Sequence, residues 1–328
     1  MKIFIYAMRE FDELDIAEKL KGEYGIDYGW SSEYPTLENA GLADGYDAVS
    51  TTPCEINKEL LQQFHKEGVK YITTRSIGYD HIDLKAAKEL GMRVSHTKYN
   101  PDGVSNYTVM LILMCLRRMP YIQKCAEVQD YTLRNKMGRD LASCTVGVIG
   151  TGQIGANVVR NLSGFGCEIL AYDIFPREGL PCKYVSLDEL YQRADIITIH
   201  TPATKENYHM INEDTIALMK QGSMIVNCAR GSMIDTEALI RGLETGKLGG
   251  AALDVLEKED GLYYHNRMGE VIENREMAIL RAFPNVILSP HTAFYTDKDT
   301  EDMLRYNFDS LYCFENGMKN PLEVNLSL

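Results

Sequence analysis

The chain has 328 residues, of which 45% are hydrophobic and 25% charged, and its formal net charge is -13. This length favours two domains, and the composition is that of a globular protein. The acidic balance argues against nucleic acid as a partner, because a phosphate backbone needs clustered Lys and Arg. The N-terminal apolar run is interrupted by charge at Arg9, too early for a signal or membrane segment.

Eight cysteines are scattered through apolar segments, with no C-x-x-C pair and no histidine at metal-ligand spacing. We therefore expect reduced thiols, no metal site and a cytoplasmic location.

The first part of the chain, up to about Asn100, alternates short β-rich runs with amphipathic helical runs. In chain order these runs are KIFIY, DELDIAEKL, YDAVST, INKELLQQF, VKYITT, DLKAAKEL and MRVSH. Alternation of this kind predicts a parallel sheet covered by helices.

A long helix is predicted after the turn Asn100-Pro101-Asp102. It takes in the apolar run 104–116 and continues in a polar stretch to about Asp130. The apolar part is too short to span a bilayer. Since it is apolar nearly all round, we expect it to be buried against the other domain or a second subunit.

A second series of strands begins at Thr145 and alternates with helical segments. The predicted strands are TVGVIG, CEILAYD, ADIITIH, SMIVNCA, GGAALDV and NVILSP. Six such runs predict a complete doubly wound sheet. The chain then passes through a polar hinge at TDKDTE into an amphipathic helix that ends at Gly317.

A glycine-rich turn connects the first strand of this second series to the helix that follows it. Its residues are Gly150, Thr151, Gly152, Gln153, Ile154 and Gly155. The first glycine permits the tight turn, the second lets a pyrophosphate approach the backbone, and the third lets helix and strand pack closely. A glycine turn without a ligand is the alternative.

The next strand favours a nucleotide ligand, because it ends in an acidic residue, Asp173, 23 residues after Gly150. A carboxylate there accepts hydrogen bonds from the adenosine ribose hydroxyls. A 2'-phosphate would meet repulsion of roughly 1 to 4 kcal/mol, so we predict NAD rather than NADP.

Three further blocks follow in order, NCARGSMIDTEAL, GGAALDVLEKED and NVILSPHTAFYT. With the glycine turn they resemble the D-isomer-specific 2-hydroxyacid dehydrogenases over nearly the whole chain. Within that family, VKYITTRSIGYDHID, YTVMLILM and LGGAALDVLE are most similar to the D-lactate dehydrogenase branch, including its vancomycin-resistance type.

The resemblance implies two doubly wound parallel-sheet domains with the active site in the cleft between them. Residues 101–297 would form a Rossmann NAD-binding domain, and 1–100 with 298–328 a discontinuous, flavodoxin-like substrate domain. It also implies a homodimer formed through the helix after residue 100.

The catalytic residues implied are Arg230, His291 and Glu259. Arg230 follows a predicted strand, where its guanidinium would grip the substrate carboxylate. His291 would exchange the proton with the substrate oxygen, and Glu259 would orient the imidazole. Glu257 and Asp260 stay open as rivals to Glu259, since the choice depends on spacing in one charged loop.

The resemblance also assigns binding residues. For the cofactor these are Pro202, Cys228 and Asp254, besides the glycine turn and Asp173; for the substrate they are Ile77, Gly78, Arg230, Tyr99 and Phe294. Asp254 would bond the nicotinamide carboxamide, and the amides of Ile77 and Gly78 the substrate carboxylate.

The substrate predicted first is pyruvate, converted to D-lactate and back. The loop from Thr51 to Cys54 stands where several relatives carry a larger aromatic residue or a histidine, which predicts a roomier pocket. Branched or aromatic 2-oxo acids, such as 2-oxoisocaproate and phenylpyruvate, are therefore the alternative. More distant alternatives are a dehydrogenase for glyoxylate or 3-phosphoglycerate and a NAD-sensing binding protein of the same fold.

Overall fold

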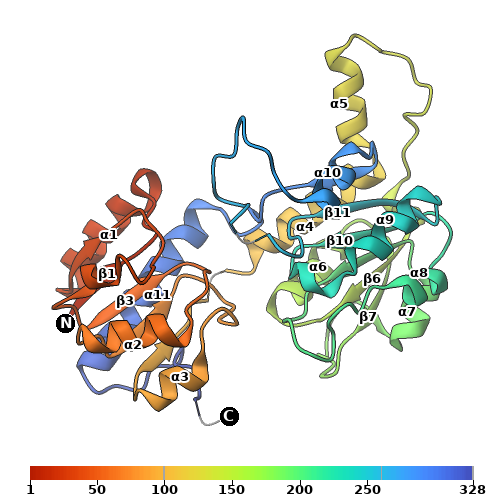
Figure 1. Ribbon diagram of the computed structural model, residues 1–328. Coiled ribbons are helices and arrows are strands. Elements are labelled where there is room, and N and C mark those ends of the chain that lie inside the picture. The colour runs from red at the N-terminus through yellow and green to blue at the C-terminus, as the bar shows by residue number, and fades with distance from the viewer. Residues whose placement is uncertain (99, 260, 327–328) are drawn as a thin grey trace. The chain divides into compact units, whose positions relative to one another are not determined.

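The computed structural model describes residues 1–98, 100–259 and 261–326. The chain divides into two compact units. In Figure 1 the first unit is coloured red to orange, with its C-terminal part in blue, and the second runs from yellow to blue. Unit 1 consists of Met1–Asn100 and Tyr295–Leu328, and unit 2 of Pro101–Phe294. The second boundary falls after Phe294, whereas the sequence analysis put it after residue 297. Each unit contains one parallel sheet, which confirms the predicted fold class of two parallel-sheet α/β domains.

The sheet of unit 1 has five strands in the order β2-β1-β3-β4-β5, all of them parallel. The strands are β1 (Lys2–Ile5), β2 (Asp27–Trp30), β3 (Ala48–Thr51), β4 (Tyr71–Thr74) and β5 (Arg93–Ser95). This is the flavodoxin-like order. The edge strand β2 was not predicted, because its sequence DYGW has little apolar alternation and none of its residues is fully buried.

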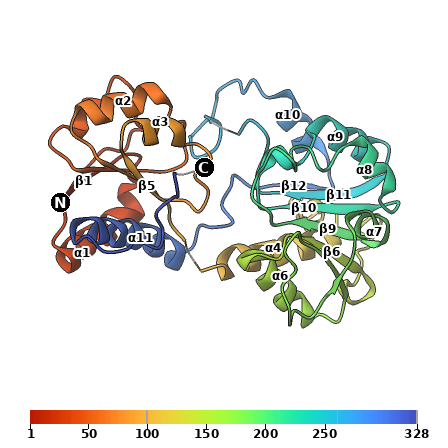
Figure 2. The same ribbon diagram turned by 90° about the horizontal axis from the view of Figure 1, so that it is seen from below.

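Helices cover both faces of this sheet. They are α1 (Glu10–Tyr24), α2 (Lys58–Lys66), α3 (Leu84–Glu89) and α11 (Asp297–Glu315), with the 3-10 turn η1 (Ala40–Ala43). One hydrophobic cluster joins α1 and α11 to Ile3 and Ile5, and the other joins η1, α2 and α3 to Val49 and Ile72. The C-terminal helix α11 lies beside α1, so the chain returns to complete the first unit (Figure 2).

The polar run TDKDTE is not a hinge but largely the first turn of α11. Thr296 caps this helix by accepting a hydrogen bond from the amide of Asp299.

The sheet of unit 2 has seven strands in the order β12-β11-β10-β9-β6-β7-β8, again all parallel. The strands are β6 (Thr145–Ile149), β7 (Glu168–Tyr172), β8 (Lys183–Tyr184), β9 (Ile196–Ile199), β10 (Ser223–Asn227), β11 (Leu248–Leu253) and β12 (Val286–Leu288). The six predicted strands are present in the Rossmann arrangement. The additional strand, β8, is a two-residue edge strand too short to carry a periodic signal.

Most helices of unit 2 form one layer on each side of its sheet, whereas α5 (Met119–Glu127) projects away from it (Figure 1). The others are α4 (Asp102–Leu116), α6 (Gln153–Ser163), α7 (Leu187–Arg193), α8 (Glu213–Leu218), α9 (Thr236–Glu244) and α10 (Arg275–Ala282), with the 3-10 turns η2 (Leu141–Ser143) and η3 (Gly231–Met233). Helices α4 and α6 pack on one face, and α7 to α10 on the other (Figure 2).

The prediction of one long helix after residue 100 was wrong, because the chain forms two helices, α4 and α5. Between them Arg118 adopts a left-handed conformation with φ of 53°. Pro120 explains the break, since it has no amide to donate to Leu116 and its ring would clash with that carbonyl. The carbonyl of Leu116 accepts a hydrogen bond from the amide of Arg139 instead.

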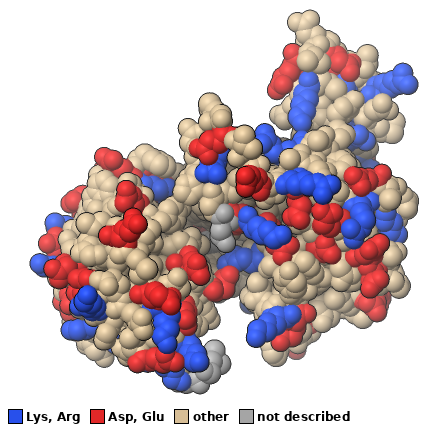
Figure 3. Space-filling view, viewed as in Figure 1, with Lys and Arg blue, Asp and Glu red and all other residues tan. Residues whose placement is uncertain are grey.

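Charges of both signs are interspersed over the face shown in Figure 3. Within the described part of the chain, no helix is long and apolar enough to cross a membrane. Nor does any group of three His, Cys, Asp or Glu side chains in residues 1–98, 100–259 and 261–326 have a geometry that could hold a metal ion.

Candidate active site

The glycine turn after β6 is tightly packed at two of its glycines and open at the third. Gly150 has φ of +91°, and a Cβ on it would lie 2.7 Å from the carbonyl oxygen of His200. A Cβ on Gly155 would lie 1.9 Å from the carbonyl oxygen of Gly150, so α6 can start this close to β6 only with glycine there. A Cβ on Gly152 would meet nothing within 4 Å. The open backbone at Gly152, directly before the N-terminus of α6, fits a bound pyrophosphate.

Asp173 follows β7 and bonds to the same turn. Its Oδ2 accepts hydrogen bonds from the amide of Thr151 at 2.5 Å and from the Thr151 hydroxyl at 3.0 Å. Its Oδ1 accepts one from the amide of Phe175 at 2.8 Å. Burial alone would raise the pKa of Asp173, but these hydrogen bonds outweigh it and the pKa is lowered. A fixed negative charge beside the glycine turn fits a ribose diol and repels a 2'-phosphate.

Two other predicted cofactor residues follow the neighbouring strands. Pro202 lies after β9, where its carbonyl accepts a hydrogen bond from the Asn207 amide group at 2.7 Å. Cys228 lies after β10, and burial raises the pKa of its thiol to about 12. These residues are at the carboxyl ends of parallel strands, as the glycine turn is, and so share one edge of the sheet.

His200, which follows β9, is a polar residue of this region that the sequence analysis did not single out. Its Nε2 lies 2.9 Å from the Thr198 hydroxyl, and burial lowers the pKa of its ring to about 3. The ring beneath the glycine turn is therefore neutral at physiological pH.

His291 and Glu259 are in hydrogen-bond contact, with Nδ1 of the histidine 2.5 Å from Oε1 of the glutamate. The side chains are 24% and 20% exposed, so both are partly shielded from solvent while the imidazole remains accessible. The other carboxylate oxygen, Oε2, accepts a hydrogen bond from the amide of Leu256 at 2.7 Å, which fixes the glutamate. An imidazole held in this way can donate a proton from Nε2 and take it back.

The turn that carries His291 is held by the buried carboxylate of Asp254. This carboxylate accepts hydrogen bonds from the Ser289 hydroxyl at 2.6 Å and from the amides of Thr292 and Ala293 at 2.9 Å each. His291 itself has φ of 53°, a left-handed conformation that costs about 1–3 kcal/mol for a residue other than glycine. Asp254 thus supports a strained backbone at the candidate acid–base residue.

Arg230 follows the short segment 228–229, which comes directly after β10. The Asn227 side chain holds this segment, since it donates to the carbonyl of Arg230 at 2.8 Å and accepts from the amide of Ala229 at 2.9 Å. A Cβ on Gly231 would lie 2.0 Å from the carbonyl carbon of Leu256. The backbone after Arg230 is therefore in direct contact with the loop that leads to Glu259.

Glu257, left open as a rival, pairs with a different histidine. Its two carboxylate oxygens each lie 3.1 Å from Nε2 of His209, and one accepts a hydrogen bond from the Tyr208 hydroxyl at 3.0 Å. Of the two glutamates, Glu259 is thus the one that the structure brings to His291. The third rival, Asp260, lies outside the described residues.

In unit 1, the predicted carboxylate-binding loop follows β4. The Ser76 hydroxyl donates to the carbonyl of Gly78 at 2.6 Å and lies 2.8 Å from the Thr74 hydroxyl, while Ile77 is exposed. The loop is therefore shaped by its own side chains. Tyr99, predicted to line the pocket, lies outside the described residues.

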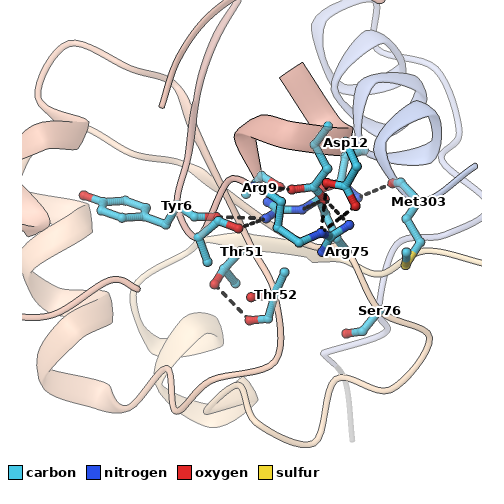
Figure 4. A network of polar contacts seen from close by, with 12 residues as sticks. Tyr6, Arg9, Asp12, Thr51, Thr52, Arg75, Ser76 and Met303 are labelled. Atoms are coloured by element: carbon cyan, nitrogen blue, oxygen red, sulfur yellow. Dashed lines mark hydrogen bonds and ion pairs between the residues drawn. The ribbon is translucent and has the colours of Figure 1, made fainter. Parts of the chain in front are cut away.

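Arg75, which precedes this loop, is fully buried at the centre of a polar network (Figure 4). Its guanidinium bonds to Glu13 at 3.1 Å, to Ser50 at 3.0 Å, and to the carbonyls of Tyr6 and Ala7 at 3.0 and 2.8 Å. These contacts tie β1, α1 and β3 to the end of β4. No pattern in the sequence indicated this role, because the partners are distant in the chain.

Two aromatic rings flank His291. The ring of Phe294, a predicted pocket residue, lies 6.3 Å from the imidazole between centroids, and that of Tyr264 lies 6.2 Å away. The Tyr264 hydroxyl also donates to the carbonyl of His291 at 2.8 Å. Tyr264 was not predicted from the sequence, because its loop is irregular and gives no periodic signal.

Comparison with known proteins shows the family of this chain. Residues 109–293 match the family described as D-isomer specific 2-hydroxyacid dehydrogenase, NAD binding domain. The chain belongs to this family. It is thus an NAD-dependent D-2-hydroxyacid dehydrogenase, which confirms the predicted enzyme class and cofactor.

Relatives of similar length are named for different substrates. The chain is 42% identical to an aromatic 2-oxoacid reductase of Clostridium sporogenes, over 96% of each protein. It is 36% identical to a D-lactate dehydrogenase of Lactiplantibacillus plantarum, over 94% of this chain and 95% of the relative. Among solved structures, a D-2-hydroxyisocaproate dehydrogenase matches with a TM-score of 0.88 and 31% identity, over 99% of each chain.

Proposed function

We propose that this enzyme reduces aromatic or branched 2-oxo acids, with phenylpyruvate as the representative substrate, to their D-2-hydroxy acids. The contact between His291 and Glu259 carries the acid–base part of this proposal. We thus prefer aromatic and branched 2-oxo acids, the alternative predicted from the sequence, to pyruvate. The chain is 42% identical to an aromatic 2-oxoacid reductase but 36% identical to the D-lactate dehydrogenase.

The proposed mechanism assigns one task to each catalytic side chain. His291 in its imidazolium form donates a proton from Nε2 to the 2-oxo oxygen, and in the reverse direction it removes the hydroxyl proton. Glu259 orients the ring through Nδ1. The planar guanidinium of Arg230 binds the substrate carboxylate and polarises the neighbouring carbonyl.

Other side chains and amides would orient the reactants. When bound, NADH supplies the hydride that reduces the 2-oxo carbon. We assign the pyrophosphate to Gly150, Gly152, Gln153, Ile154 and Gly155, and the ribose to Asp173. The nicotinamide side is assigned to Pro202, Cys228 and Asp254. The amides of Ile77 and Gly78 would hold the substrate carboxylate, and Tyr99 and Phe294 would line the pocket.

The preference for a large substrate side chain is supported by one loop of unit 1 and one aromatic residue of unit 2. The loop Thr51–Cys54 contains only small side chains, and the Thr51 hydroxyl is engaged within the loop by the Thr52 carbonyl at 3.0 Å. An apolar ring also gains from contact with Phe294, since paired aromatic rings contribute about 0.5–1.5 kcal/mol beyond burial.

Steady-state rates of NADH oxidation with phenylpyruvate, 2-oxoisocaproate, 2-oxobutyrate and pyruvate test the proposal, together with chiral analysis of the product. We expect kcat/KM for phenylpyruvate to exceed that for pyruvate by about tenfold or more, which corresponds to the 1–3 kcal/mol typical of pocket selectivity. A preference for pyruvate would overturn the substrate assignment. Absence of turnover with all four acids, while NADH still binds, would overturn the proposed reaction.

We further propose that the enzyme is a cytoplasmic homodimer formed through α4 and α5, where the single helix was predicted. The stretch after α5 exposes large apolar side chains, among them Leu133 and Met137 at 89% each, and α4 exposes Met110. Exposed apolar residues clustered in this way are typical of an interface. The eight free thiols fit a reducing compartment. Light scattering of the purified enzyme and of a Leu133→Glu, Met137→Glu variant tests both parts of this proposal. A monomeric mass for the purified enzyme would refute the dimer, and an unchanged dimeric mass for the variant would refute this interface.

A further inference from the structure

One short segment contacts His291 at two different points. Glu259 reaches the ring at Nδ1, and Tyr264 reaches the backbone carbonyl through its hydroxyl. Both residues belong to the loop between β11 and α10. The ring contact belongs to the proposed mechanism, whereas the carbonyl contact does not.

The position of Tyr264 is built into the fold. The amides of Leu262 and Tyr263 donate to the carbonyl of Glu259 at 3.0 and 3.2 Å, which forms a turn linking the glutamate to the tyrosine. Tyr263 is buried in the core cluster on one face of the unit 2 sheet. Tyr264 then takes a left-handed φ of 67°, and its hydroxyl meets the carbonyl of His291.

The carbonyl contact matters because His291 has a strained backbone. With φ of 53°, an ordinary residue tends to return to negative φ unless its neighbours hold it. Its amide is held by the carbonyls of Asp254 at 2.8 Å and Ser289 at 3.0 Å, and its carbonyl by Tyr264. Rotation about this residue would swing the imidazole away from Glu259.

We propose that Tyr264 is a positioning residue for His291: its hydroxyl keeps the left-handed backbone in place, so that the imidazole stays in register for proton transfer. This inference rests on the acid–base role proposed for His291. It predicts a loss in kcat rather than in substrate binding, since a misplaced proton donor slows the chemical step.

The test compares Tyr264→Phe with Tyr208→Phe in the full-length enzyme. The first variant retains the ring beside His291 and removes only the hydroxyl. The second removes a tyrosine hydroxyl of the same unit, one that bonds to Glu257. For Tyr264→Phe we expect kcat with phenylpyruvate to fall about 3- to 10-fold, the effect of one neutral hydrogen bond, with KM for both substrates within twofold. The solvent deuterium isotope effect on kcat should rise, and Tyr208→Phe should match the wild type in every measurement.

Three outcomes would overturn the inference: an unchanged kcat in Tyr264→Phe, an equal loss in both variants, or a loss of kcat with an unchanged isotope effect. His291→Gln is measured alongside. If it retains full turnover, the proposed function itself fails, whereas a large loss there with no effect of Tyr264→Phe refutes only the positioning role. The midpoint of thermal unfolding of Tyr264→Phe should fall only by the small amount expected for one hydrogen bond, and a large drop would count against positioning.

Discussion

Replacing Glu259 by Gln removes a negative charge at 2.5 Å from the His291 ring and retains nearly the same side-chain shape. A hydrogen bond to a charged group contributes about 1.5–3 kcal/mol, and both side chains are shielded from most of the solvent. If this whole contribution stabilises the transition state in which the imidazolium donates its proton, its loss should lower kcat about 10- to 150-fold.

Glu257→Gln is the matched control, since it makes the same change two residues earlier in the same loop. Its carboxylate serves His209 and Tyr208, so we expect kcat within about twofold of the wild type. NADH oxidation with saturating phenylpyruvate gives kcat for both variants, and fluorescence titration gives the affinity for NADH, which neither should change.

A double variant distinguishes a shared role from two independent ones. If Glu259 acts through His291, then Glu259→Gln combined with His291→Gln should be no slower than His291→Gln alone. The reasoning fails if the two losses multiply, if Glu259→Gln stays within twofold of the wild type, or if Glu257→Gln loses as much.

Three further predictions concern the cofactor turn and the polar network of unit 1. Gly155→Ala, whose Cβ would lie 1.9 Å from a backbone oxygen, should lower the free energy of unfolding by about 1–3 kcal/mol in denaturant titrations. In Gly152→Ala the new Cβ would meet no protein atom within 4 Å, so this variant should unfold like the wild type but have a higher KM for NADH. Equal stability losses in the two variants would contradict this expectation. Asp173→Asn should reduce the kcat/KM preference for NADH over NADPH by about tenfold or more. Because the pKa of Asp173 is lowered and its charge persists in mild acid, the wild-type preference should be the same at about pH 5 and pH 7; a preference that disappears at the lower pH would refute this. Arg75→Met removes one of the two cations that pair with the buried carboxylate of Glu13, so the free energy of unfolding should fall by about 3–5 kcal/mol. A loss below about 1 kcal/mol would show that the network is not tightly coupled.

Most of the fold could be predicted from the sequence, because buried parallel strands are continuous apolar runs separated by amphipathic helices. The exceptions are segments where apolar periodicity is not the deciding factor. Edge strands β2 and β8 have too few buried residues to show a pattern. The break between α4 and α5 was missed, although Pro120 was visible, because the apolar and polar runs on either side both favoured a helix.

The candidate site was predictable where a residue type has one strong physical reason for its position. Gly150 and Gly155 are required by a positive φ and a backbone contact, respectively. Spacing could not separate Glu257 from Glu259, because an irregular loop has no fixed direction for successive side chains. The hydrogen bond between Tyr264 and His291 spans 27 residues, and no local pattern predicts such a contact.

The contacts around His291 stabilise two local features that are unfavourable by themselves. A left-handed histidine and a fully buried aspartate are each unfavourable alone, the first by about 1–3 kcal/mol and the second by several kcal/mol if its charge were unpaired. Asp254 offsets its burial with three hydrogen bonds, and the same bonds hold the turn that strains His291. The two costs are therefore coupled, because relaxing the histidine would remove donors from the aspartate. This coupling holds the backbone that carries the imidazole, and Glu259 bonds to the ring, an arrangement that suits the proposed general acid role.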